Sequence, residues 1–250
     1  MAASSKKTTQ TAIRSIPPGL ALSHLVSCVV VYIIVDAALK FEHATEALAF
    51  YGVYHREPWN QFIHFFGVPG ILLSLLIFLV HLPLPLLGNG NSSKNITYGS
   101  MLSLFYLGFY LNLDPIGGTL YAPLLYGMYK LAIYFKEKDQ AKAQASGVTN
   151  CWCGTGKLFV WALVLHVLSW YVQIHLGHHI IEGAQPASLQ NLGGALTVAP
   201  LFAFYEGMWL LGINNELQAS TLALVDQLTQ DLCTSGTVVM RACENVLVST

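Results

Sequence analysis

Residues 61–87 read QFIHFFGVPGILLSLLIFLVHLPLPLL and contain no Asp, Glu, Lys or Arg. A helix needs about 20 predominantly apolar residues to cross the ~30 Å hydrocarbon core of a bilayer. The rest of the chain has the same character: 54% of its 250 residues are hydrophobic and only 10% are charged, against roughly 25% charged residues in soluble domains. We therefore predict a membrane protein.

Five further stretches are mostly apolar and cover residues 20–39, 99–113, 116–135, 157–177 and 193–213. Segments that cross lipid must satisfy their own backbone polar groups, which favours helices. The sequence therefore predicts an all-α, polytopic membrane helix bundle with about six spans. The third and fourth spans are short and are separated only by NLDP at residues 112–115, so they could instead form a re-entrant hairpin.

These spans divide the chain into three parts. Residues 1–19 are polar and basic and end in Pro-Pro-Gly, which predicts a flexible cytosolic tail. Residues 20–213 form the helical membrane domain. Within residues 214–250, apolar side chains recur at helical spacing in NNELQASTLALVDQLTQDL, which predicts an amphipathic helix followed by a tail.

Lysine and arginine residues predict the orientation, because short cytoplasmic loops are enriched in them. They gather in the N-terminal tail and in the connector at residues 136–157, so both segments are predicted to be cytosolic. With six spans, residues 40–60 and 178–192 then share the opposite, lumenal face.

Net charge and cysteine content exclude other classes of protein. The formal net charge is −1, so the chain offers no basic field for phosphate backbones, and nucleic-acid binding is not expected. The five cysteines are scattered and odd in number, which indicates neither a disulfide framework nor a zinc knuckle.

Nine histidines are the informative residues, because ionisable groups inside a membrane are costly and indicate function. Five of them fall in two clusters. In the first, His55 precedes a helix that Pro58 is suited to begin, and Asn60 and His64 share one helical face. Asn60 is placed to orient the imidazole or a bound water. A polar cap on a membrane helix would explain Asn60 but not two histidines.

The second cluster reads HLGHHIIE at residues 175–182. If the helix continues, His175, His178 and Glu182 recur at spacings of three and four, which lets them converge on one ion. Neutral imidazoles with a carboxylate and open coordination positions suit iron(II) that must bind oxygen and substrate. No cysteine accompanies either cluster, so thiolate-rich zinc is not expected. Both clusters fall on the same predicted membrane face, which supports one shared site.

At these residues the sequence resembles the Mpo1-like family of endoplasmic-reticulum membrane proteins. The resemblance covers about residues 41–218. It rests on Tyr51-x-x-x-His55-x-x-Pro58-x-Asn60-x-x-Ile63-His64-x-x-Gly67-Val68-Pro69 and on Trp170-x-x-Gln173 followed by Gly177-His178-x-x-x-Glu182-Gly183-x-x-Pro186-Ala187. The family often carries an Arg or Lys before the Pro-Ala pair, where this chain has Ala184-Gln185. Arg56 could take that role toward a substrate carboxylate if the fold brings it close.

The resemblance implies an iron(II)-dependent, 2-oxoglutarate-independent dioxygenase of the endoplasmic reticulum membrane. Its substrates would be O2 and a 2-hydroxy fatty acid, which loses one carbon during breakdown of phytosphingosine, with the acyl chain reached from the membrane lipid. His55, His64 and His178 would bind the iron, with His175 or Glu182 completing the site or orienting a ligand. The candidate catalytic residues are Tyr51, Asn60, Gln173 and Glu182.

Two other hypotheses about the role of the histidines stay open. The sequence HLGHH at residues 175–179 matches the HxxHH box of di-iron membrane desaturases and hydroxylases, although these need about eight histidines in three boxes. A membrane scaffold or small transporter could also use the histidines to line a polar seam.

Overall fold

The computed structural model describes residues 18–84, 96–147, 153–235 and 243, and this part of the chain is helical without a strand. The predicted all-α class is therefore confirmed. Of the predicted tail at residues 1–19, residues 1–17 lie outside the described residues, and the first helix begins at Pro18. The helices are α1 (Pro18–Ala38), α2 (Ala44–Gly52), α3 (Pro58–Val80), α4 (Tyr98–Leu113), α5 (Pro115–Ala145), α6 (Lys157–Tyr171), the π-helix η1 (Val172–Glu182), α7 (Ala187–Gln190), α8 (Leu192–Leu210) and α9 (Asn215–Ser235).

Local chemistry explains where the central helices begin. Pro58 and Pro115 occupy the first turns of α3 and α5, where their missing N–H groups cost nothing. Asp114 caps α5 by accepting from the backbone N–H of Ile116 at 3.0 Å. Thr97 caps α4 through a reciprocal pair of hydrogen bonds with Ser100. These caps break the apolar sequence into separate helices.

The number of helices that could cross a membrane is smaller than predicted. Among the described residues, α3 and the continuous helix Lys157–Glu182 are long and apolar enough, and α8 with α9, bent by 120°, could make a third span. The six-span prediction is therefore wrong by this measure. The apolar part of α1 is short, and α4 has 16 residues. The apolar run of α5 continues into a charged half that contains Lys136, Lys138 and Lys142.

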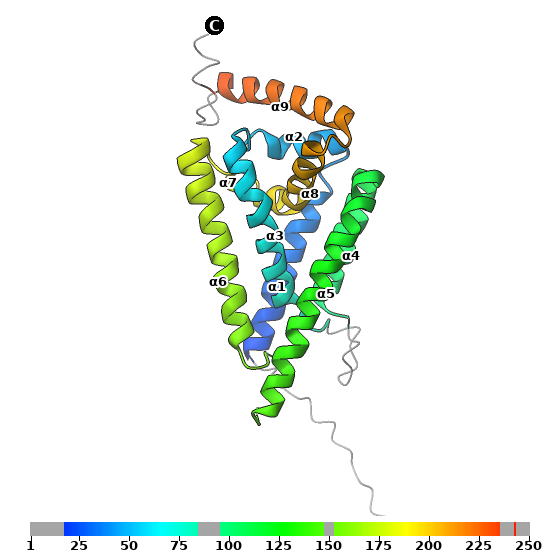
Figure 1. Ribbon diagram of the computed structural model, residues 1–250, viewed down its shortest axis with the longest axis vertical. Coiled ribbons are helices and arrows are strands. Elements are labelled where there is room, and N and C mark those ends of the chain that lie inside the picture. Colours follow the sequence, from blue (N-terminus) through cyan, green and yellow to red (C-terminus); the bar gives the residue numbers. More distant parts are fainter. Residues whose placement is uncertain (1–17, 85–95, 148–152, 236–242, 244–250) are drawn as a thin grey trace, which may run out of the picture.

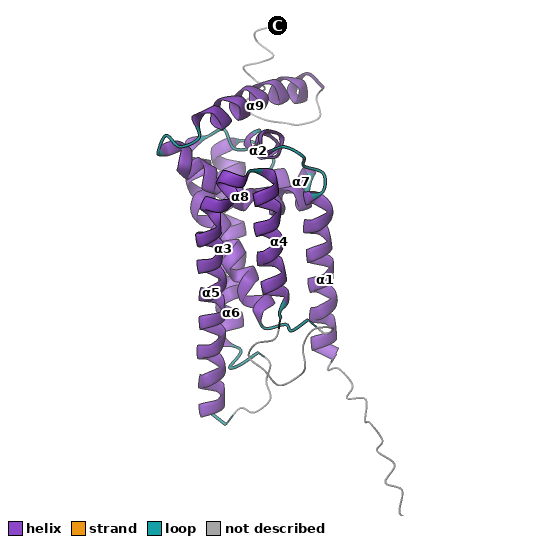
Figure 2. Ribbon diagram, turned by 90° about the vertical axis from the view of Figure 1, so that its right-hand side faces the viewer, coloured by secondary structure: helices purple, strands orange, loops and turns teal. Residues whose placement is uncertain are grey.

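The helix α3 runs through the middle of the bundle, with α4, α5, α6, η1 and α8 packed against it (Figure 1). The short helices α2 and α7 lie at one end, and α9 crosses over that end (Figure 2). Buried tyrosines join α4 to α8. The Tyr106 hydroxyl donates to the backbone carbonyl of Leu196, and the Tyr110 hydroxyl donates to that of Thr197, both at 2.9 Å. This end of the bundle holds the polar residues discussed below.

The outer face of α6 is strongly apolar, as expected for a helix in contact with lipid. Its exposed side chains are Val160, Trp161, Leu163, Val164, Leu165, Val167, Leu168 and Tyr171. Of the apolar 18-residue stretch within the helix Lys157–Glu182, only 17% is buried inside the protein. Membrane association therefore agrees with both the length and the surface of this helix.

Cysteine pairing differs from the expectation. Cys233 at the end of α9 forms a disulfide with Cys243, and Cys153 is disulfide-bonded as well. Cys28 is free. The odd number of cysteines therefore did not exclude disulfides.

Candidate metal centre

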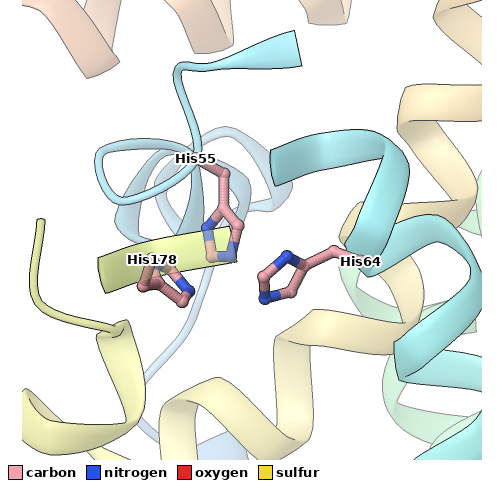
Figure 3. Close-up of side chains that lie close together, drawn as sticks. All are labelled: His55, His64 and His178. Carbon is pink, nitrogen blue, oxygen red and sulfur yellow. The ribbon is translucent and has the colours of Figure 1, made fainter. Parts of the chain in front are cut away.

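Three buried histidines converge near the end of the bundle that α9 covers. His55 comes from the loop between α2 and α3, His64 from the second turn of α3, and His178 from η1. The potential ligand nitrogens, one from each residue, all lie within 4.8 Å of one another. The ring centroids are 4.3 to 4.9 Å apart and the rings are nearly perpendicular. Figure 3 shows the three imidazoles turned toward a common point.

Backbone carbonyls fix the tautomers of two of these rings. Nδ1 of His55 lies 2.8 Å from the carbonyl oxygen of Tyr51, and Nδ1 of His64 lies 2.9 Å from that of Asn60. A carbonyl can only accept, so each Nδ1 carries the proton and each Nε2 presents a lone pair. This arrangement is typical of metal-binding histidines, whose other nitrogen donates to a carbonyl or carboxylate.

Two of the buried ring nitrogens have no hydrogen-bond partner within the described chain, namely Nε2 of His55 and Nδ1 of His178. Burial, together with the neighbouring imidazoles of His64 and His178, lowers the pKa of His55 well below 6.5. His55 is therefore neutral at pH 7, the form that binds metals. A buried acceptor without a partner is costly, and a metal ion would remove that cost.

The Tyr51 ring packs on the face of the His55 imidazole. The two rings stack with centroids 4.0 Å apart and planes 10° from parallel. Phe202 on α8 packs against both rings at 4.9 and 5.9 Å. His55 lies in a loop, where a side chain is otherwise free to rotate, and this stacking restricts it to one orientation.

Glu182 connects the end of η1 to the start of α3. Its two carboxylate oxygens accept hydrogen bonds from the backbone N–H groups of Arg56 and Glu57 and from Nδ2 of Asn60, at 2.9 to 3.0 Å. These N–H groups lie at a helix N-terminus, where donors are unsatisfied and negative charge is favourable. Glu182 therefore positions the His55 loop and the first turn of α3 against η1, with both oxygens already engaged.

The π-helical winding of η1 decides which side chains face inward. A π-helix closes hydrogen bonds between residues i and i+5, so side chains four and five apart share a face. Gln173, Gly177, His178 and Glu182 are accordingly buried. His175 is exposed and lies outside the cluster, with its ring between Tyr171 and His179 at 5.2 and 5.8 Å.

The three histidines line the polar end of a narrow cavity between α3, η1 and α8. Tyr51 and Gln173 also line it, and the Gln173 amide donates to the carbonyl of Ser169 at 2.9 Å. The remaining wall is mostly apolar and includes Val68, Ile71, Leu72, Leu75, Tyr106, Trp170, Ile174, Leu196 and Ala199. None of the described residues that line it is Lys or Arg. The cavity therefore joins the three imidazoles to a mostly apolar wall.

The condition set for Arg56 is not met, and Glu206 was not singled out by the sequence analysis. The Arg56 guanidinium turns away from the histidines and donates to Asp226 at 2.7 Å and to Thr229 at 3.1 Å on α9. It is therefore not available to a carboxylate at the cluster. Glu206 on α8 is buried, and its carboxylate oxygens have no hydrogen-bond partner within the described chain. Its one signal in the sequence is an acidic residue inside the apolar run 193–213.

We expect Glu182→Ala to lower the free energy of unfolding by about 3 kcal/mol, because buried donors left without an acceptor cost about 1–3 kcal/mol each. Metal retention should fall as well, since the His55 loop loses its attachment to η1. Thermal unfolding in detergent and metal content after gel filtration would measure both. Glu57→Ala is the matched control: Glu57 is exposed and its side chain makes no capping bond. Equal effects from both variants would contradict the positioning role of Glu182.

Comparisons with known proteins agree with the motifs. Residues 41–209 match the family model described as "2-hydroxy-palmitic acid dioxygenase Mpo1-like". The chain is 29% identical over 173 residues to the 2-hydroxy-palmitic acid dioxygenase MPO1 of Saccharomyces cerevisiae. The aligned region covers 69% of this chain and 84% of the yeast protein. No solved structure matches. The matched region contains all three clustered histidines and Glu182, and the chain therefore belongs to the Mpo1-like family, as the motifs predicted.

Proposed function

We propose that this protein is an iron(II)-dependent dioxygenase that shortens a 2-hydroxy fatty acid by one carbon. The observation that carries the proposal is the convergence of three buried imidazoles at the polar end of an apolar cavity. The description of the matching family and the name of the yeast relative, a 2-hydroxy-palmitic acid dioxygenase, support the substrate class.

The reaction balances without a further reductant. The bond between C1 and C2 breaks, C1 leaves as carbon dioxide, and C2 becomes the carboxyl carbon of the shorter acid. Together the two carbons lose four electrons, and O2 accepts them. One oxygen atom of O2 enters the new carboxyl group, and the other leaves as water. This balance explains why 2-oxoglutarate would not be needed.

His55, His64 and His178 would hold the metal, and the donor set fits iron(II). Imidazole nitrogens bind zinc, copper, iron and nickel, and three of them leave coordination positions for substrate and oxygen. Zinc has no redox chemistry, whereas the reaction consumes O2. Bound iron(II) would supply the electron transfer that activates oxygen beside the substrate.

The residues of the chain would bind and orient the substrate. The apolar wall of the cavity takes the acyl chain and leaves the carboxylate and the 2-hydroxyl at the imidazoles. Gln173 and Tyr51 line this end and are the nearest candidates to hydrogen-bond the 2-hydroxy acid. Since none of the described lining residues is Lys or Arg, the carboxylate needs the positive charge of the metal centre. Substrate binding and metal binding are therefore expected to depend on each other.

The surroundings of the cavity indicate how a lipid would enter. Two of its walls, α3 and η1, belong to the candidate membrane spans. An acyl chain dissolved in the bilayer could therefore reach the cavity without crossing water. This route agrees with an enzyme of the endoplasmic reticulum membrane that acts on phytosphingosine-derived acids, which is the localisation and pathway we propose.

The di-iron alternative finds no support in the second histidine cluster. His175 and His179 lie exposed on η1, and the described residues contain one group of three potential ligands that could hold a metal, the buried triad. We therefore expect one iron per chain rather than two.

The proposal is tested by anaerobic purification in detergent, reconstitution with iron(II) and aeration with 2-hydroxyhexadecanoate. The fifteen-carbon acid should form in proportion to bound iron and without 2-oxoglutarate, as scored by mass spectrometry. Zinc-loaded protein and hexadecanoate without the 2-hydroxyl are the controls and should give no product. Iron retained at one per chain without any shortened acid would overturn the proposed reaction.

A further inference from the structure

A second, larger cavity lies on the other side of His55. It is open to the surface, has a volume of about 850 Å³ and is lined by the His55 loop, α3, the end of α8, and α9. His55 is the one lining residue that it shares with the narrow cavity at the triad. Its size falls in the range of about 300–1,000 Å³ that small-molecule sites occupy. The family match ends at residue 209, so α9 lies outside the matched region.

Polar atoms without partners belong to residues that line this cavity. Glu206 is 8% exposed, and neither of its carboxylate oxygens has a hydrogen-bond partner within the described chain. The hydroxyl of Thr221, a residue that is 1% exposed, and Nε1 of Trp209 also lack partners there. All three residues line the cavity. Buried polar groups are normally paired, so this group of atoms indicates a polar ligand.

The charges of the wall decide the sign of that ligand. Arg56 lines the cavity, but Asp226 at 2.7 Å neutralises its guanidinium. The carboxylate of Glu206 is left without a counter-charge on the described wall. A primary ammonium group would provide both the counter-charge and the N–H donors that the Glu206 oxygens lack, and it would stabilise the ionised carboxylate that burial alone disfavours.

Apart from Gln61 and Gln218, the rest of the wall is apolar, and it reaches the surface of the protein. Its outer part consists of Phe62, Phe65, Phe66, Leu210, Leu211 and Leu222, all of them exposed. The phenylalanines belong to α3, a candidate membrane span. A Cβ on Gly207 would lie 2.9 Å from the Phe65 ring, so glycine is needed for this ring to rest on α8. A ligand with a polar head at Glu206 would therefore have an apolar chain along these side chains.

We propose that the second cavity binds a long-chain primary amine, with the ammonium group on Glu206 and the alkyl chain along the phenylalanines of α3. This site does not depend on the iron chemistry proposed above. Since His55 belongs to both cavities, an occupied amine site would contact the back of a metal ligand. The two ligand classes are separated by charge: an acid at the triad and an amine at Glu206.

The test uses the full-length protein in nanodiscs and a hexadecylamine probe with a photoreactive diazirine in the chain. Cross-links are mapped by peptide mass spectrometry and should fall on residues 62–66 and 202–222. Unlabelled hexadecylamine should compete, whereas hexadecanoate and hexadecanol should not. Glu206→Gln should weaken binding about tenfold, since it removes a charge-assisted bond but preserves shape.

Two further variants keep the test decisive. Asp231→Asn removes an exposed acid from α9 outside the cavity and should leave binding unchanged. Leu222→Arg adds a positive charge at the exposed edge and should weaken amine binding with Glu206 intact. Each variant is checked for a normal gel-filtration profile. Wild-type affinity in Glu206→Gln, or equal competition by hexadecanol, would overturn the proposal.

Discussion

His178→Ala is expected to abolish iron retention and to lower dioxygenase activity by well over 100-fold, whereas His175→Ala should leave both within about twofold. Loss of a group that merely orients a metal ligand typically costs about 10–100-fold, so loss of a ligand should exceed that range. The two residues are three positions apart on the same helix. His178 is buried and His175 is exposed, so the two substitutions form a matched pair that differs in burial.

Iron content after anaerobic reconstitution and product formation from 2-hydroxyhexadecanoate would measure this difference. Unfolding temperatures of the apo-proteins would show that both variants fold. The proposed ligand set would be wrong if His175→Ala lost iron as completely as His178→Ala. It would also be wrong if His178→Ala retained a full complement of iron.

Gly177→Ala is expected to disturb the contact between η1 and α3. A Cβ at this position would overlap Oδ1 of Asn60 and lie 3.4 Å from Cε1 of His64. The methyl group would therefore push η1 away from α3 at the point where Glu182 joins them. We expect a loss of about 1–3 kcal/mol in stability, as for other overpacked cores, together with weaker iron binding.

Gly127→Ala is the control for this prediction. Gly127 lies inside α5, and a Cβ there would meet no atom within 4 Å. The same substitution should stabilise the protein by about 0.5–1 kcal/mol, because glycine is a poor helix former. Thermal unfolding and iron titration of both variants would separate the steric effect at Gly177 from the change in helix propensity. A stabilised Gly177→Ala with normal iron affinity would contradict the tight packing of η1 on α3.

The predicted ligands His55, His64 and His178 do lie together in the structure, whereas the role of His175 or Glu182 beside them was left open, and metal binding itself stays a prediction. Histidine spacing singled out both clusters, because a chain with so few charged residues makes ionisable side chains conspicuous. The choice among His175, His178 and Glu182 assumed the α-helical period, under which all three share a face. The π-helical winding of η1 turns His175 outward, and no single residue type announces that winding. His175 stays a sequence prediction that the geometry does not favour.

Hydropathy predicted a membrane protein but overestimated the number of crossings. It detects apolar runs, whereas a span also depends on where a helix starts and ends. In α5 the helix continues past its apolar half to Ala145, and α4 ends at Leu113 after 16 residues. The second cavity was not predictable either, because Glu206 and Thr221 come from helices whose mutual angle of 120° is set by tertiary packing.

The triad also has a consequence for biosynthesis. His55 and His64 are close in sequence, but His178 follows His64 by 114 residues. At about 5–20 residues per second, a ribosome needs roughly 6–23 s to add that length. During this time the nascent chain carries two of the three imidazoles without Glu182 to fix them. On the proposed function, iron would therefore be captured stably only after η1 has been synthesised and docked on α3, and metal loading would be a late step in the maturation of this protein.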